Sequence, residues 1–216
     1  MTPTRICCKN REEWLQKRLI GIGGSEAAAA VGMSKWQTPV DLWKLKLGIT
    51  QPKDLSGNPA VQQGNRMEPA LRTMFATLHP EFEVEYHQFD MLFQADRQWL
   101  FATLDGELID LETGERGILE IKTATPSGKA GWSEWSEGKT PGGYYVQLLH
   151  QLLATGYDFS ILFAALFAYN GDITLREYSI ARKDVEDDLA WLLEQETRFW
   201  EQNVLQHRMP PMPLTI

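Results

Sequence analysis

The sequence predicts an α/β fold in which a mixed central β-sheet is flanked by helices. Five segments have the apolar runs or alternation typical of strands, and segments with helical spacing and capping residues precede, separate and follow them. No repeat and no long linker divides the 216 residues, so we expect a single domain over residues 1–216. It would comprise a helical part at about residues 10–80, a sheet core at about 81–180 and a last helix at about 182–203.

Four helices are expected in the N-terminal part. Ser25 is a favourable cap for the second helix, and Pro39 is favourable at the start of the third. Asn58 begins the fourth, in which Pro69 should distort the backbone because proline cannot donate the helical hydrogen bond. The four helices are expected at about residues 11–18, 25–32, 39–48 and 59–78.

The rest of the chain is predicted to alternate between strands and helices. Strands are expected at about residues 82–93, 100–110, 117–123, 159–169 and 173–180, the last two joined by a turn at Asn170-Gly171. A helix over residues 144–155 should end at Gly156, and the last helix carries an apolar stripe that predicts packing on the sheet. Residues 125–143 are rich in Gly, Ser and Pro, so we expect a mobile loop there.

Composition narrows the class of protein. Hydrophobic residues make up 43% of the chain, which provides for a sizeable core, and no apolar run is long enough to span a membrane. The first residues lack an apolar stretch, and Cys7 and Cys8 are adjacent and poorly placed for a disulfide, so we expect a cytoplasmic protein. The net charge of -8 argues against a general electrostatic grip on nucleic acid.

The strongest functional signal is a group of charged residues on a predicted hairpin. Residues 113–116 read as a tight turn, and folding there sets Asp105 opposite Glu120 or Lys122. Glu120 and Lys122 are two residues apart, so their side chains leave the same face of the strand, roughly 6.6 Å from one another. Leu119 and Ile121 point the other way. Two carboxylates and an ammonium group should therefore converge on one patch.

A divalent metal explains why two carboxylates would lie side by side. Neighbouring carboxylates raise each other's pKa unless a cation neutralises them, and oxygen ligands with open positions suit Mg²⁺. Lys122 could then orient or deprotonate an attacking water, or stabilise charge on a phosphate oxygen. Spacing alone leaves an alternative at about even odds, in which Glu120 and Lys122 form an ordinary ion pair on an exposed hairpin.

Two further polar features accompany this group. The glycine-rich turn at residues 21–24 leads into the helix capped by Ser25, and such a helix start can bind a phosphate, although a plain capping turn is equally compatible. Gln147 and Gln151 share one face of the helix over residues 144–155, which indicates a polar face turned toward a site. His150 on the same helix is expected to be structural.

Five short motifs in this order resemble the phage lambda exonuclease and YqaJ-type viral recombinase nucleases of the PD-(D/E)XK superfamily. The resemblance runs from about residue 14 to residue 169, and Leu104 stands where the superfamily often has proline. It implies a restriction-endonuclease-like core with a mixed central β-sheet flanked by helices. The motifs are RLIGIGGSE at 18–26, GNRMEP at 64–69, LDG at 104–106, LEIK at 119–122 and YYVQLLHQ at 144–151.

The resemblance implies a Mg²⁺-dependent exonuclease, with Mn²⁺ able to substitute, that degrades one strand of double-stranded DNA from its 5′-phosphorylated end. It also implies a ring-shaped homotrimer and a single-strand annealing protein as partner in recombination. Metal ligands would be Asp105, Glu120 and the carbonyl of Ile121, with Glu68 at a second metal or its waters. Catalysis would also use Lys122 and Gln147. The implied DNA-binding residues are Arg18, Ser25, Thr103, Lys35, Tyr144 and Gln151, and Thr103 stands where the family often has serine.

Two rival functions stay open at this point. An endonuclease on the same core would have no use for a pocket that binds a free 5′-phosphate. A DNA-binding or assembly protein without catalysis would not need Asp105, Glu120 and Lys122 together.

The implied ring is compatible with the net negative charge, because only its inner surface has to be basic. The candidate lysines for that inner surface are Lys35, Lys44, Lys46 and Lys53.

Overall fold

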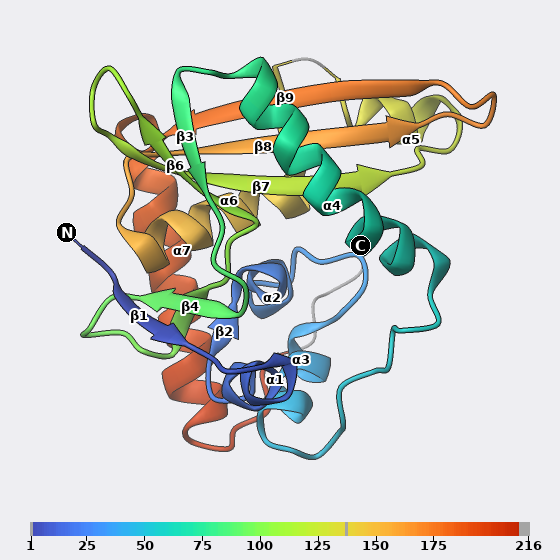
Figure 1. Cartoon of the computed structure of the whole chain (residues 1–216). Coiled ribbons are helices and arrows are strands. Elements are labelled where there is room, and N and C mark those ends of the chain that lie inside the picture. The colour runs from blue at the N-terminus through green and yellow to red at the C-terminus, as the bar shows by residue number, and fades with distance from the viewer. Residues whose placement is uncertain (1, 137, 212–216) are drawn as a thin grey trace.

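The computed structural model describes residues 2–136 and 138–211. Two sheets form its framework (Figure 1). The larger sheet has the strand order β3 (Phe82–Glu85), β6 (Gly106–Asp110), β7 (Arg116–Ala124), β8 (Phe159–Phe167) and β9 (Ile173–Ala181). The smaller sheet has the order β1 (Thr4–Cys7), β4 (Asp90–Phe93), β5 (Leu100–Ala102) and β2 (Ile22–Gly23). Both sheets are mixed, because β7 and β8 are parallel, as are β2 and β5. The mixed sheet with flanking helices was expected.

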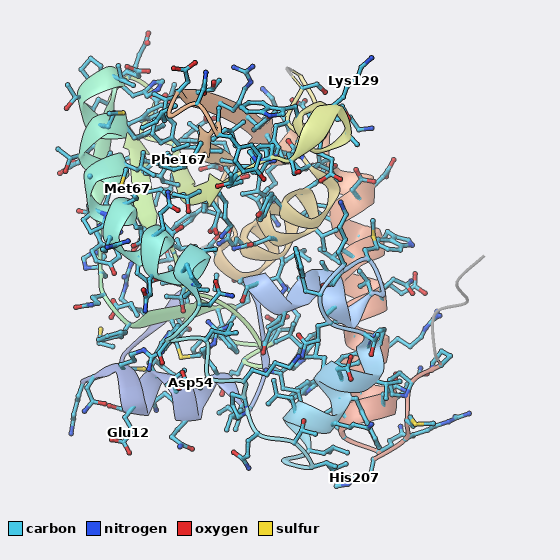
Figure 2. The ribbon with its side chains drawn as sticks, turned by 90° about the vertical axis from the view of Figure 1, so that its right-hand side faces the viewer. Glu12, Asp54, Met67, Lys129, Phe167 and His207 are labelled. Atoms are coloured by element: carbon cyan, nitrogen blue, oxygen red, sulfur yellow. The ribbon has the colours of Figure 1, made fainter. Side chains whose placement is uncertain are left out.

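Helices lie on both faces of the larger sheet. The helices of the described chain are α1 (Arg11–Arg18), α2 (Gly24–Ala30), α3 (Pro39–Lys46), α4 (Pro59–Leu78), α5 (Gly128–Ser133), α6 (Gly142–Thr155) and α7 (Glu186–Arg198), and α1 and α3 lie beside the smaller sheet (Figure 1). A short 3₁₀ turn (Arg182–Asp184) precedes α7, and a π-helical segment (Phe199–Val204) continues it. Viewed at 90° to Figure 1, α4, which carries Met67, lies on one side and α7 on the other, with α6 between them (Figure 2). None of the described helices is long and apolar enough to cross a membrane.

The alternation of side chains along β7 divides the core in two. Leu119 and Ile121 pack with Leu71 and Phe75 of α4 on one face of the sheet. Ile118, on the opposite face, packs with the apolar residues of α6 and α2. Glu120 and Lys122 alternate with the α4-facing residues, so they leave β7 on the side of α6. This outcome agrees with the orientation predicted for the hairpin.

Two predicted strands are each divided between the two sheets, so those two predictions were wrong. The segment 82–93 forms β3 in the larger sheet and β4 in the smaller one, with a turn at Phe89 in the left-handed region (φ 65°). The segment 100–110 forms β5 and β6 in the same divided manner. Apolar residues occur on both sides of each point where the chain crosses from one sheet to the other, so the sequence pattern does not reveal these crossings. The second crossing, residues 103–105, sets Asp105 at the junction of the sheets.

Other predictions differ from the structure in local detail. Residues 125–143 are not irregular throughout, because they contain α5 and because Trp135 is buried against Tyr144 and Tyr178; residue 137 lies outside the described part. Helix α4 continues through Pro69 without interruption. The short strands β1 and β2 were not predicted.

Candidate active site

Asp105 and Glu120 lie opposite each other where β6 and β7 begin to separate. The ladder pairs Gly106 with Leu119, and its register sets the preceding Asp105 opposite Glu120. Asp105 Oδ2 accepts a hydrogen bond from the backbone N–H of Ile121 at 2.8 Å. One carboxylate oxygen of Asp105 is therefore fixed by β7. The predicted hairpin register is confirmed, and it selects Glu120 rather than Lys122 as the facing residue.

Glu120 is held by side chains from two elements. Nε2 of Gln147 donates to Oε1 of Glu120, and Nε2 of Gln151 donates to Oε2, each at 2.6 Å. Lys122 Nζ also donates to Oε1. Glu120 is only 2% exposed, and the two glutamines are one turn apart on α6, as their spacing predicted. The carboxylate is thus fixed in orientation by buried donors.

The charges of these residues depend on one another. Burial and the Glu120 carboxylate raise the pKa of Asp105 well above its usual range, and the nearby Lys122 offsets part of that effect. Burial by itself lowers the pKa of Lys122, but Glu120 and Asp105 raise it by more, so the net pKa is above its usual value. The ammonium group lies 5.6 Å from the ring centroid of Tyr144. Without a metal, Lys122 is the cation that neutralises this pair.

Glu68 approaches the same carboxylate from α4. Arg72 hydrogen-bonds to both Glu68 and the backbone carbonyl of Asp105, and the Glu68 carboxylate contributes to the raised pKa of Asp105. The Glu68 carboxylate accepts its hydrogen bond from Arg72, one helical turn later, with 2.5 Å between Glu68 Oε1 and Arg72 Nη2. Glu68 is therefore paired and partly buried.

The donor set fits a magnesium ion better than a softer metal. No group of three or more His, Cys, Asp and Glu side chains among the described residues is arranged to hold a metal ion. Two carboxylates, Asp105 and Glu120, together with the Ile121 carbonyl, offer hard oxygen atoms, and Mg²⁺ commonly takes one or two carboxylates and keeps several waters.

The three predicted phosphate-binding residues are connected to one another through Trp14. Arg18 Nη2 donates to Ser25 Oγ at 3.1 Å, and its guanidinium carbon lies 4.6 Å from the ring centroid of Trp14. Trp14 Nε1 donates to Thr103 Oγ1 at 3.0 Å. Trp14 therefore belongs to this cluster of side chains, although the sequence offered no signal for it beyond its position one turn before Arg18.

The start of α2 connects this cluster to the two glutamines that hold Glu120. A methyl group added at Gly24 would lie 3.2 Å from Cγ of Gln151 and 3.4 Å from Cγ of Gln147, so the helix start packs directly on the two glutamines that hold Glu120. Glu26 accepts from the backbone N–H of Gly23 and from Lys46. The glycine-rich turn therefore lies beside the candidate metal ligands.

The two lysines nearest α2 have different environments. The side chain of Lys46 is fully buried, where it contacts Glu26 and the carbonyl oxygen of Arg18; its prediction as a lumen residue was wrong, because this buried ion pair stabilises the turn instead. Lys35 is exposed and pairs with Glu134 at 2.5 Å. Lys35 lies on the loop that follows α2.

His150 lies in the core, as predicted. It is fully buried, with Nδ1 2.8 Å from Oε1 of Glu196 and Nε2 2.9 Å from the carbonyl oxygen of Phe101. Burial by itself lowers the pKa of His150, but Glu196 and the Phe101 carbonyl raise it by more. Cys7 and Cys8 are both free thiols.

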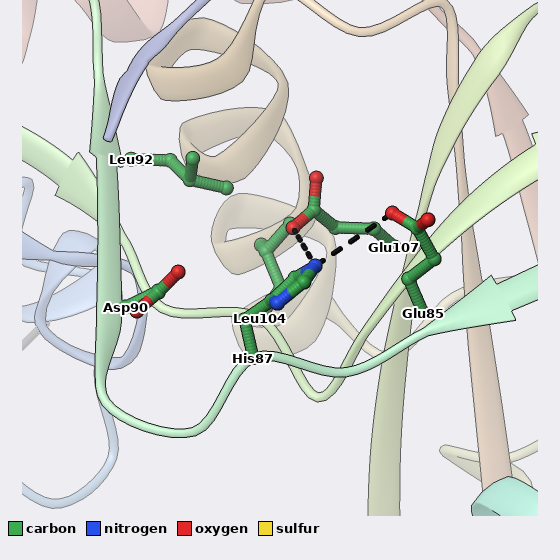
Figure 3. Close-up of a pocket in the computed structure, with 6 residues that line it drawn as sticks. All are labelled: Glu85, His87, Asp90, Leu92, Leu104 and Glu107. Atoms are coloured by element: carbon green, nitrogen blue, oxygen red, sulfur yellow. Dashed lines mark ion pairs between the residues drawn. The ribbon is translucent and has the colours of Figure 1, made fainter. Parts of the chain in front are cut away.

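A polar pocket lies farther along β6 (Figure 3). Its buried Glu107 accepts from Arg5 at 2.5 Å and from the hydroxyl of Tyr157, and His87 Nε2 lies 3.9 Å away. Arg5 also pairs with Asp90 at 2.9 Å. Because β1 belongs to the smaller sheet and β6 to the larger one, the ion pair of Arg5 with Glu107 joins the two sheets.

Comparisons with known proteins agree with this architecture. The family model described as the YqaJ-like viral recombinase domain matches residues 13–158. The uncharacterized protein YqaJ of Bacillus subtilis (strain 168) is 28% identical over 208 residues, which make up 94% of this chain. The chain spans 59% of the length of that relative.

Solved structures of exonucleases have the same fold. The alkaline exonuclease LHK-Exo of Laribacter hongkongensis matches with a TM-score of 0.58 and 19% identity, over 92% of this chain and 100% of that chain. Its complex with dAMP gives a TM-score of 0.58 at 20% identity with the same coverage. A phage-related exonuclease from Haemophilus somnus 129PT matches with a TM-score of 0.56 and 12% identity, over 89% and 99% of the two chains.

These likenesses confirm the restriction-endonuclease-like fold expected from the five motifs. The family match covers most of the region over which those motifs occur, from the first helix to the start of β8. The chain therefore belongs to the family of the YqaJ-like viral recombinase domain.

Proposed function

We propose that the chain is a Mg²⁺-dependent deoxyribonuclease that degrades one strand of linear double-stranded DNA from a 5′-phosphorylated end. The observation that carries this proposal is the packing of Gly24 on Gln147 and Gln151. Through it, a pocket suited to a terminal phosphate adjoins the carboxylate that the two glutamines hold. A terminal phosphate and a scissile bond can then be bound side by side.

Each residue has a defined part in this proposal. Asp105, Glu120 and the Ile121 carbonyl hold the metal, and Glu68 serves a second ion or its water shell. When bound, Mg²⁺ activates water and neutralises charge on the phosphate. The Lys122 ammonium, which lies beside Glu120, would orient the attacking water or stabilise charge on a phosphate oxygen. Gln147 and Gln151 keep Glu120 in place.

The phosphate pocket selects the strand end. The Arg18 guanidinium has donors for two phosphate oxygens, and the hydroxyls of Ser25 and Thr103 supply further hydrogen bonds. Tyr144 and Lys35 extend the DNA-binding surface, and Mn²⁺ substitutes for Mg²⁺. We infer that the protein assembles as a ring-shaped homotrimer. It would act in the cytoplasm in phage-type recombination, together with a single-strand annealing protein. These inferences follow the family resemblance and concern a chain that spans 59% of its curated relative.

The experiment that tests this function uses linear and closed circular duplexes of one sequence, with Mg²⁺ or EDTA. Each linear duplex carries a 5′-phosphate or a 5′-hydroxyl and a label on one strand. We expect mononucleotides from the 5′-phosphorylated strand, slower release from the 5′-hydroxyl end, and intact circles. Efficient nicking of circles would favour an endonuclease, and binding of DNA without any cleavage would favour the non-catalytic alternative.

A further inference from the structure

Arg72 contacts two of the candidate metal-site residues without being a ligand itself. It lies on α4, one turn after Glu68, and its side chain is only 14% exposed. Its Nη2 donates to Glu68 Oε1 at 2.5 Å, and its Nε donates to the backbone carbonyl oxygen of Asp105. One guanidinium group therefore links the helix that carries Glu68 to the strand junction that carries Asp105.

The bond to Asp105 goes to its backbone rather than to its carboxylate. Asp105 lies just outside the paired residues of β6, at the crossing between the two sheets. Arg72 holds the carbonyl end of this residue, and the N–H of Ile121 holds one oxygen of the side chain. Asp105 is thus fixed at two points while its carboxylate keeps lone pairs free for a cation.

Tyr86 holds the guanidinium group from its open side. The guanidinium carbon of Arg72 lies 3.6 Å from the ring centroid of Tyr86, at the distance of a stacked cation–π contact. A flat guanidinium can stack on a ring and donate along its edge at the same time, whereas the ammonium of lysine cannot. The three contacts together require arginine.

We propose that Arg72, held by Tyr86, is a positioning residue that sets the separation of Asp105 and Glu68 for a divalent cation. This inference rests on the proposed function, since it assumes that these carboxylates serve a metal. Outer partners that fix metal ligands commonly contribute about 10–100-fold to metal affinity. Arg72 would act before any DNA is bound.

The test measures Mn²⁺ binding by electron paramagnetic resonance of the free ion, without DNA, in the whole protein. Arg72→Lys is expected to weaken Mn²⁺ binding by about tenfold or more, and Tyr86→Leu by a smaller factor, because both loosen the same contacts. Tyr86→Phe keeps the ring and should bind Mn²⁺ more tightly than Tyr86→Leu does. The matched control is Arg198→Lys on α7, whose arginine also pairs with a glutamate one turn away, Glu194, but is exposed.

The outcomes separate this inference from the function on which it rests. Asp105→Ala should abolish tight Mn²⁺ binding; if wild type and Asp105→Ala bind Mn²⁺ equally weakly, the metal site itself is wrong. If wild type binds tightly and a folded Arg72→Lys binds equally tightly, the positioning role is wrong and the metal site stands. Circular dichroism and thermal unfolding establish whether each variant is folded. If Arg72→Lys does not fold, Mn²⁺ binding by Tyr86→Leu tests the positioning role instead.

Discussion

The carboxylate of Asp105 accepts a hydrogen bond from the backbone N–H of Ile121, with 2.8 Å between Oδ2 and N. This bond ties the loose end of β6 to the middle of β7, at the point where the chain changes sheets. It brings an aspartate next to Glu120 in a partly buried position. Because the two carboxylates repel each other when both are ionised, this arrangement lowers the stability of the metal-free protein.

Metal-free Asp105→Asn should be more stable than wild type at pH 8. The pKa of Asp105 is raised in the folded protein by burial and by Glu120, so ionisation favours the unfolded chain, and stability is lost as the pH rises above about 4, the value in unfolded chains. Asparagine keeps an acceptor for the Ile121 N–H without the charge. In EDTA, thermal unfolding should show a midpoint a few degrees higher for the variant at pH 8 and no difference near pH 4.

Asp110→Asn is the control of opposite sign. The N–H groups of Thr113 and Glu112 lower the pKa of Asp110, so its stabilising effect is present above about pH 4 and is lost at lower pH. This variant should be less stable than wild type at pH 8. Mg²⁺ should raise the unfolding midpoint of wild type but not that of Asp105→Asn. A metal-free Asp105→Asn that unfolds earlier than wild type at pH 8 would contradict the electrostatic account of the site.

Arg18→Ala should reduce the preference for 5′-phosphorylated ends by about tenfold or more, because charge-assisted hydrogen bonds contribute roughly 1.5–3 kcal/mol. Trp14→Phe keeps a ring beneath Arg18 but loses the donor to Thr103, so a smaller reduction is expected. The measurement is the ratio of kcat/KM on 5′-phosphate and 5′-hydroxyl duplexes. Arg11→Ala, an exposed arginine on the same helix, is the control, and an unchanged ratio in Arg18→Ala would remove the pocket assignment.

The buried pair of His150 and Glu196 should stabilise the fold at pH values at which His150 is protonated. Removing one partner of a buried pair costs about 3–5 kcal/mol, so Glu196→Ala should lower the free energy of unfolding by about that amount at pH 6. The net pKa of His150 is raised, so this stabilisation is complete below about pH 6.5 and is lost as the pH rises through the folded-state pKa. Urea unfolding at pH 6 and pH 8.5 checks both statements.

The exposed pair of Glu194 and Arg198 is the natural comparison. Glu194→Ala should change the free energy of unfolding by less than about 0.5 kcal/mol at either pH. Equal losses in Glu194→Ala and Glu196→Ala, or a Glu196→Ala loss that does not shrink at pH 8.5, would show that the ionic state of His150 does not matter.

Light scattering at micromolar concentration should find a closed homo-oligomer, with a trimer as the expected form. The remaining lumen candidates after Lys46 is excluded are Lys35, Lys44 and Lys53. Lys35→Glu with Lys53→Glu should weaken duplex binding and flatten its salt dependence, because fewer counterions are released. Lys183→Glu, at an exposed site before α7, is the control. A monomer that degrades long duplexes without dissociating would contradict the ring.

The sequence contained enough to predict the hairpin of the site. The turn at residues 113–116 and the two-residue spacing of Glu120 and Lys122 depend only on local geometry, and both agree with the structure. The i, i+4 spacing of Gln147 and Gln151 is local in the same sense. Their common target, Glu120, is a long-range partner, which spacing within one helix cannot reveal.

The features that were missed depend on contacts between distant segments. Trp14 meets Thr103 across 89 residues, and Arg72 meets Asp105 across 33. The division of segment 100–110 between two sheets is invisible to apolar alternation, because buried apolar residues occur on both sides of the crossing. The sequence around Lys46 is typical of a surface lysine, and only the structure shows that its ammonium group binds Glu26 and the Arg18 carbonyl.

The central claim, that Asp105, Glu120 and Lys122 form one DNA-hydrolysing metal site, is tested most directly by single-turnover cleavage. A 5′-phosphorylated linear duplex is mixed with excess enzyme and Mg²⁺, and nucleotide release is followed for wild type, Asp105→Asn, Glu120→Gln and Lys122→Met. We predict rapid release by wild type, abolished by EDTA, and rates at least about 10³-fold lower for each folded variant, since groups acting as a unit fail together. Release within tenfold of wild type by any of the three variants would contradict the claim.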